Sequence, residues 1–273
     1  MVFGRIAGVA TVGILALALT GCSGSGGATP TATPTPVKPS GDGILRIGDL
    51  APISGDLATY AAAQAAGIEL AAREINDQGG YNSVPVEVLH RNAGDGDAAV
   101  TETNFNDLVT RGVDVILAPA SGNVAETLQL LVKETKANVA IVSVAVKANA
   151  PKDVSVDPVK ADDAFTARLK SSDPSVTEFA YGTEFYDLTM ASALAAVTQK
   201  DDGGASITQG LIAVTGAGIK CNSYGMCLDV LKTEPAIDYV GQAGQINYSA
   251  TTGVVYFGKT STEPVPSPKS SKK

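Results

Sequence analysis

Residues 44–144 alternate between short apolar runs and longer amphipathic stretches, and this alternation constrains the fold more than any other feature. The apolar runs, rich in β-branched residues, occupy 44–50, 84–90, 113–117 and 139–144. Helical periodicity fills the intervals over 57–77, 97–111 and 123–136. Buried strands that alternate with helices form parallel sheets with helices on both faces. The sequence therefore predicts an α/β fold, a doubly wound parallel sheet in three α/β/α layers.

Two Ser-Gly pairs, Ser54-Gly55 and Ser121-Gly122, follow the first and third predicted strands. Doubly wound sheets bind ligands outside the carboxyl ends of their strands, where the strand order reverses, commonly between these two strands. Because each pair stands before a predicted helix, free backbone N–H groups and the positive helix end would favour an anion such as a carboxylate there. Serine and glycine are also ordinary helix caps, so the pattern alone leaves ligand binding and simple capping both open.

The amino terminus predicts an exported lipoprotein. Arg5 precedes an apolar stretch over 6–19, which is shorter than the roughly 20 residues of a membrane span and typical of a signal peptide. The stretch ends in Leu-Thr-Gly-Cys at 19–22, which matches the lipobox of lipoprotein signal peptidase. We expect residues 1–21 to be removed and Cys22 to be acylated, which would anchor an extracytoplasmic protein to the outer face of the cell membrane. An ordinary signal peptide with a chance cysteine is the alternative.

Low-complexity segments flank the predicted domain. Residues 22–43 consist mainly of Gly, Ser, Thr, Pro and Ala with very few large apolar side chains, which is the composition of a disordered tether. Residues 263–273 have the same character and predict a disordered tail. The folded domain is accordingly expected over 44–262.

Composition and motifs argue against an enzyme and against nucleic-acid binding. The net charge is −8 and becomes −9 once Arg5 is removed with the signal peptide, and such an acidic chain is poorly suited to bind nucleic acid. His90 is the only histidine, no His/Cys/Asp cluster has metal-ligand spacing, and Ser54 and Ser121 lack the Gly-x-Ser-x-Gly elbow. We expect no catalytic residues, no metal and no cofactor.

Four motifs, in order along the chain, resemble one protein family. They are Pro-Ile-Ser-Gly at 52–55 with Ile-Asn-Asp-Gln-Gly-Gly at 75–80, Asp-Val-Ile-Leu at 114–117 followed by Ala-Ser-Gly at 120–122, Phe-Tyr-Asp-Leu at 185–188, and Ile-Asp-Tyr-Val-Gly at 237–241 with Gly-Gln-Ile at 244–246. Together they resemble the leucine/isoleucine/valine-binding family of type I periplasmic binding proteins. Members of that family are the solute-binding components of amino-acid ABC importers.

The resemblance implies a role for several residues. Ser121 would hydrogen-bond the ligand carboxylate together with the backbone near Gly122. The backbone of Ala145 would bind the ligand's amino or carboxyl group, and Tyr60 would lie along its side chain. Ser54 would be a contact at the rim of the site.

The chain departs from the family in two ways. Val146 stands where the family usually places a threonine whose hydroxyl contacts the ligand. Only about 40 residues separate Val146 from Tyr186, where family members build a second lobe, and a Pro/Ser/Lys tail replaces the final strands of that lobe. The chain therefore resembles lobe 1 alone. Loss of the acidic residue that lobe 2 supplies, with neighbouring hydrogen bonds, would weaken binding by about 3–6 kcal/mol.

Cys221 and Cys227 are the two cysteines beyond the lipobox, and they stand six positions apart. In an exported protein such a pair predicts a disulfide that closes a small loop.

These inferences predict an extracytoplasmic solute-binding lipoprotein of an amino-acid (branched-chain-type) ABC transporter, a truncated or degenerate member with weak ligand binding. Its expected partners are a small-molecule ligand of the amino-acid class, an ABC permease, the membrane through the lipid anchor only, and a second copy in a homodimer. The alternative is a non-transporting interaction or scaffold lipoprotein that uses the same lobe.

Overall fold

The computed structural model describes residues 37–55, 57–94, 97–121, 123–145 and 157–258. Contacts divide the chain into residues 1–36 and 37–273, and all the described residues belong to the second unit. The predicted signal peptide and tail, most of the predicted tether, Cys22, Gly122 and Val146 lie outside the described residues.

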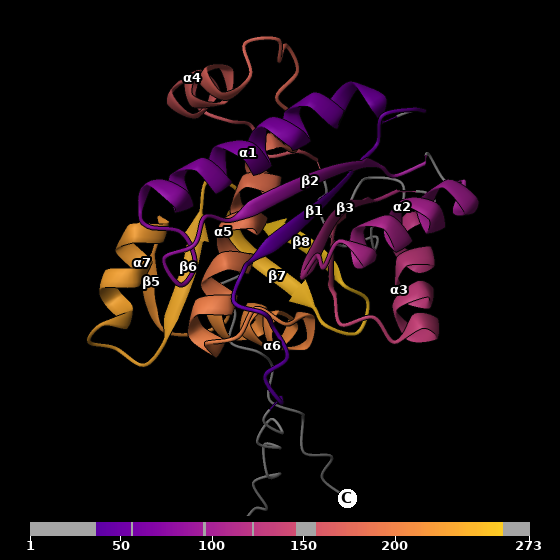
Figure 1. Ribbon diagram of the computed structural model, residues 1–273. Coiled ribbons are helices and arrows are strands. Elements are labelled where there is room, and N and C mark those ends of the chain that lie inside the picture. Colours follow the sequence, from indigo (N-terminus) through magenta and orange to yellow (C-terminus); the bar gives the residue numbers. More distant parts are fainter. Residues whose placement is uncertain (1–36, 56, 95–96, 122, 146–156, 259–273) are drawn as a thin grey trace, which may run out of the picture. The chain divides into compact units, whose positions relative to one another are not determined.

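Eight strands form one sheet in the order β2-β1-β3-β4-β8-β7-β6-β5 (Figure 1). The strands are β1 (Arg46–Ala51), β2 (Glu87–Asn92), β3 (Val115–Ala120), β4 (Ala140–Ala145), β5 (Ile219–Cys221), β6 (Ile237–Gly241), β7 (Gly244–Ser249) and β8 (Val254–Gly258). All neighbouring strands pair in parallel except β6 with β7 and β7 with β8. The reversal of strand order falls between β1 and β3, as in other doubly wound sheets.

Helices cover both faces of this sheet (Figure 1). They are α1 (Ala61–Asp77), α2 (Ala98–Thr110), α3 (Val124–Thr135), α4 (Asp163–Ser172), α5 (Gly182–Gln199), α6 (Gly204–Val214) and α7 (Tyr224–Leu231), with a 3₁₀ turn η1 (Ala58–Tyr60) before α1. Alternate residues of β3 enter two separate cores. Val115 and Leu117 pack with α1, α5, α6 and α7, whereas Ile116 and Ala118 pack with α2 and α3. The predicted three-layer α/β/α class is confirmed.

The amino-terminal half matches its sequence pattern closely. Each helix and strand from β1 to β4 begins and ends within four residues of the predicted bounds. The stop of α1 illustrates the reason, because Gly80 has a φ of +71° and donates its N–H to the carbonyl of Ile75 at 3.0 Å. A Cβ at this position would lie 2.1 Å from the carbonyl oxygen of Val84, so only glycine fits this turn.

Carboxylates hold the backbone at the amino ends of the strands. Asp201 accepts the N–H groups of Ser40 and Gly41 at 3.0 and 2.8 Å, and Asp202 accepts that of Gly43 at 3.0 Å. Asp114 accepts the N–H of Arg46 at 2.8 Å, where β1 begins. The last residues of the predicted tether, 40–43, are therefore hydrogen-bonded to the domain.

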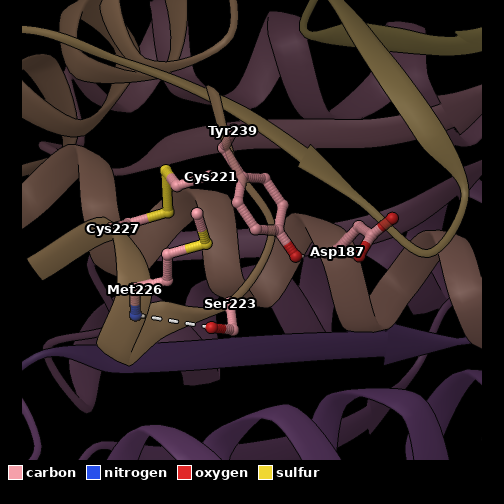
Figure 2. Close-up of a disulfide and its surroundings, with 6 residues drawn as sticks. All are labelled: Asp187, Cys221, Ser223, Met226, Cys227 and Tyr239. Atoms are coloured by element: carbon pink, nitrogen blue, oxygen red, sulfur yellow. Dashed lines mark hydrogen bonds between the residues drawn. A yellow bond between two sulfur atoms is a disulfide. The ribbon is translucent and has the colours of Figure 1, made fainter. Parts of the chain in front are cut away.

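The carboxyl-terminal part is fixed by a disulfide and a buried carboxylate (Figure 2). Cys221 on β5 and Cys227 on α7 are bonded, with their Cα atoms 5.2 Å apart, which confirms the predicted pair. Ser223 caps α7 by accepting the N–H of Met226 at 3.4 Å.

Asp187, in the second turn of α5, binds the β6–β7 turn. It accepts a hydrogen bond from the hydroxyl of Tyr239 at 2.9 Å, and Figure 2 shows these two side chains. It also accepts the N–H groups of Gln242 and Ala243 at 2.9 and 2.5 Å. These bonds join the hairpin to the helix. No helix within the described ranges is long and apolar enough to cross a membrane.

Candidate functional site

The predicted ligand residues gather at the carboxyl edge of the sheet. β1 and β3 are hydrogen-bonded neighbours that pair Asp49 with Leu117, so both strands end at this edge. Ser54 lies exposed in the bend after β1, and Ser121 is half-buried directly after β3. The sequence was therefore right that the two serines stand at neighbouring strand ends.

Neither serine opens a helix, which corrects one part of the sequence interpretation. The N-cap of α1 is Tyr60 and that of α3 is Asn123, and neither makes a side-chain cap hydrogen bond. The 3₁₀ turn η1 separates Ser54 from α1. Ser121 contributes its carbonyl, which accepts the N–H of Val124 at 2.9 Å. The hydroxyls of both serines are thus not used for capping.

β4 brings a third strand end to the same edge. Ala145 pairs in register with Ala120 and is buried, so its backbone lies beside the residue that precedes Ser121. This placement suits the backbone contact that the family resemblance implies for Ala145.

A pair of tyrosines forms the aromatic part of the edge. The rings of Tyr60 and Tyr181 meet edge to face, with centroids 5.2 Å apart. Tyr181 has a φ of 67°, a left-handed conformation that is uncommon for a bulky residue and often marks a functional position. Burial, and then the nearby Glu184 carboxyl, raise the pKa of the Tyr181 hydroxyl to about 12, so it stays protonated at neutral pH.

Sequence reasoning missed Tyr181, which directly precedes α5 at Gly182. The family motif in Phe-Tyr-Asp-Leu drew attention to residues that belong to the second turn of the helix. An aromatic residue directly before Gly182 was the only available signal, and it does not reveal a left-handed backbone.

Glu184 is the acidic residue on the first turn of α5, and it is buried. Its two carboxylate oxygens accept the N–H of Val159 and the hydroxyl of Thr183, each at 2.7 Å. Burial raises the pKa of this carboxyl. Glu184 is therefore held by hydrogen bonds within the chain and shielded from solvent.

His90, on the edge strand β2, bridges two carboxylates, one from β1 and one from α1. Its Nδ1 lies 2.7 Å from Asp49 and its Nε2 lies 2.7 Å from Glu69, and these hydrogen bonds raise the pKa of the imidazole to about 10. Asp49 is fully buried and also accepts a hydrogen bond from Gln64. The histidine therefore balances a buried charge, and both of its ring nitrogens are occupied. Within the described part of the chain, no group of three or more His, Cys, Asp or Glu residues forms a metal site.

Residues 44–164 match the periplasmic binding protein family. The matched segment contains β1 to β4 and the beginning of α4, and therefore every strand end described above. No curated protein sequence matched the chain.

Solved structures give two kinds of match. A putative branched-chain amino-acid ABC transporter protein from Silicibacter pomeroyi is 12% identical with a TM-score of 0.50, and the match covers 81% of this chain and 90% of that one. The Silicibacter protein therefore has the same fold as this chain. The isoleucine-bound substrate-binding protein of a branched-chain amino-acid transporter from Streptococcus pneumoniae is 29% identical, with a TM-score of 0.34. That match covers 38% of this chain and 30% of the Streptococcus chain, so this chain spans less than a third of that protein's length.

Proposed function

We propose that this protein is an extracytoplasmic solute-binding lipoprotein of an amino-acid ABC transporter, built on lobe 1 alone. The observation behind the proposal is that Ser121 and the Ala145 backbone lie at the ends of the neighbouring strands β3 and β4, within the segment that matches the periplasmic binding protein family. The ligand is an amino acid of the branched-chain type, and the partner is an ABC permease.

We expect weak rather than tight binding at this edge. Hydrogen bonds from a ligand to Ser121 and the Ala145 backbone replace bonds to water and contribute only about 0.5–1.5 kcal/mol each. Glu184 is buried and hydrogen-bonded to Val159 and Thr183, so its carboxyl group is not exposed to a ligand's amino group.

Calorimetry of the monomer against leucine, isoleucine and valine tests the proposal. We expect dissociation constants no tighter than about 0.1 mM. Ser121→Ala should weaken the binding further, whereas Ser171→Ala should leave it unchanged, because the exposed Ser171 hydroxyl bonds the carbonyl of Arg168 on its own helix. Micromolar binding by a monomer, abolished by Ser121→Ala, would instead identify a complete transport receptor.

The lipid anchor is part of the same proposal. Acylated Cys22 would hold the protein on the outer face of the membrane, because two or three acyl chains at about 0.8 kcal/mol per buried CH₂ bind almost permanently. Cys22→Ser should move the protein to the soluble fraction. Membrane retention of this variant would contradict the anchor and leave the ligand proposal intact.

A scaffold lipoprotein is the second candidate. The side chain of Ile53, beside Ser54, is 60% exposed, so a partner that covered this edge would bury it. A second copy of this chain is the partner that we propose. Gel filtration that gives a dimer, together with no amino-acid binding, would favour this candidate.

A further inference from the structure

A groove adjoins the candidate site on the side of β3 that faces away from β1. It has a volume of about 670 Å³ and lies between α3 and the β7–β8 hairpin. Its lining includes Ala120, Glu126, Gln129, Leu130, Val254 and Tyr256. Because Ala120 directly precedes Ser121, the groove is continuous with the strand end that carries the proposed carboxylate contact. Its volume is in the usual range for small-molecule sites.

The walls of the groove combine apolar side chains with the polar residues Gln129, Thr251 and Thr252, and Glu126 is the one acidic residue in the lining. Leu130 is 57% exposed, and Val254 and Tyr256 are only partly buried, so apolar surface stays in contact with water. Glu126, one helical turn before Leu130, makes no hydrogen bond or ion pair with any described residue. An acid in the first turn of a helix is common because it complements the helix dipole. That general preference does not account for an exposed leucine one turn further along, beside a cavity.

We propose that this groove binds the ammonium group of a small apolar molecule. The ammonium would pair with the carboxylate of Glu126, and the apolar body would cover Leu130, Val254 and Tyr256. In an amino acid, the carboxylate would extend toward Ser121. For amino acids the inference rests on the proposed function. The side chain of the amino acid would then lie in this groove rather than along Tyr60.

Three ligands of matched shape separate the contributions of the two charged groups. Leucine carries both groups, 3-methylbutylamine carries only the ammonium, and 4-methylpentanoate carries only the carboxylate. In a titration of the purified chain followed by backbone amide NMR, the two amines should shift signals of residues 126–130 and 254–256. 4-Methylpentanoate, which lacks the ammonium group, should shift the same signals only at about fivefold higher concentration. Glu126→Gln should weaken both amines about fivefold, the effect of losing one exposed ion pair. Leu130→Ala should weaken them about threefold.

Glu134→Gln is the matched control, because Glu134 is an exposed acid on the same helix outside the groove. This variant should change neither the affinity for leucine nor the affinity for 3-methylbutylamine. Equal binding of 4-methylpentanoate and the amines, or no effect of Glu126→Gln, would overturn the inference. If leucine shifted only the amide signals of Ser54, Tyr60 and Tyr181, the inference would also be overturned, but the proposed function would stand. If 3-methylbutylamine bound and leucine did not, amino-acid binding would be contradicted, and the groove would remain a site for apolar amines. Absence of amine binding at about 50 mM would also overturn the inference.

Discussion

The two ends of the sheet differ in how their polar groups are used. At the amino ends of the strands, the backbone of 40–43 donates three N–H groups to Asp201 and Asp202, which are 5% and 2% exposed. At the carboxyl ends, Ser54 is exposed and Ser121 is half-buried, and neither caps a helix. The large apolar side chain of Ile53 also faces water there.

This difference separates residues that hold the fold from residues that are available to a ligand. A buried carboxylate that accepts several N–H groups stabilises the folded state, because a hydrogen bond to a charged group contributes about 1.5–3 kcal/mol. A hydroxyl with no protein partner at an exposed edge contributes little to folding and can bind a solute.

The double change Asp201→Ala with Asp202→Ala should be the most damaging. It removes the acceptors for Ser40, Gly41 and Gly43. We expect the free energy of unfolding, measured by urea denaturation, to fall by about 2–4 kcal/mol. Asp229→Ala is the control, because Asp229 is exposed and pairs only with exposed Lys232, so it should cost less than about 0.5 kcal/mol. Equal losses in the two proteins would show that the amino-edge bonds do not hold the fold.

The pH dependence of stability should change in Asp114→Asn. Burial, with help from the negative charges of Asp202 and Asp42, raises the pKa of Asp114 to about 7. An acid with a raised folded-state pKa stabilises the fold when protonated, and this contribution is lost as pH rises from about 4 to about 7. The asparagine still has an oxygen to accept the N–H of Arg46. Between pH 4 and pH 8, the variant should lose less stability than the parent, by a difference of about 1–3 kcal/mol. Identical pH profiles would contradict an elevated pKa.

Ser54→Ala and Ser121→Ala should have the smallest effects on stability. Since the described structure uses neither hydroxyl as a helix cap, each should change the free energy of unfolding by less than about 0.5 kcal/mol. Thermal unfolding of both variants checks this. A loss above about 1 kcal/mol would show that these hydroxyls hold the fold, which would weaken the case for a binding site.

The sequence predicted β1 to β4 well because each of these elements carries its own local signal. Apolar β-branched runs mark the strands, and glycines such as Gly80 stop the helices. The pairing of β8 with β4, which joins Val254 to Ser143, was not predictable in this way. It connects residues more than a hundred positions apart, and no local pattern specifies such a partner.

The candidate site was likewise predictable only in part. Strand order and the Ser-Gly pairs placed Ser54 and Ser121 at one edge, because parallel neighbours end together. Tyr181 was missed for two reasons. Its ring contacts Tyr60, which lies far away in the sequence, and its own backbone is left-handed, which no local pattern reveals. The hydrogen bond from the N–H of Val159 to Glu184 was not predictable either, because it joins residues 25 positions apart in the sequence.

Amide hydrogen exchange, followed with and without leucine at millimolar concentration, tests the contrast between the two edges most directly. We predict slow exchange at Ser40, Gly41 and Gly43, whose N–H groups bind buried carboxylates, and fast exchange around Ser54 and Ser121 in the free protein. Leucine should slow exchange only at the carboxyl edge. Fast exchange at 40–43, or protection around Ser54 and Ser121 that leucine leaves unchanged, would contradict the account.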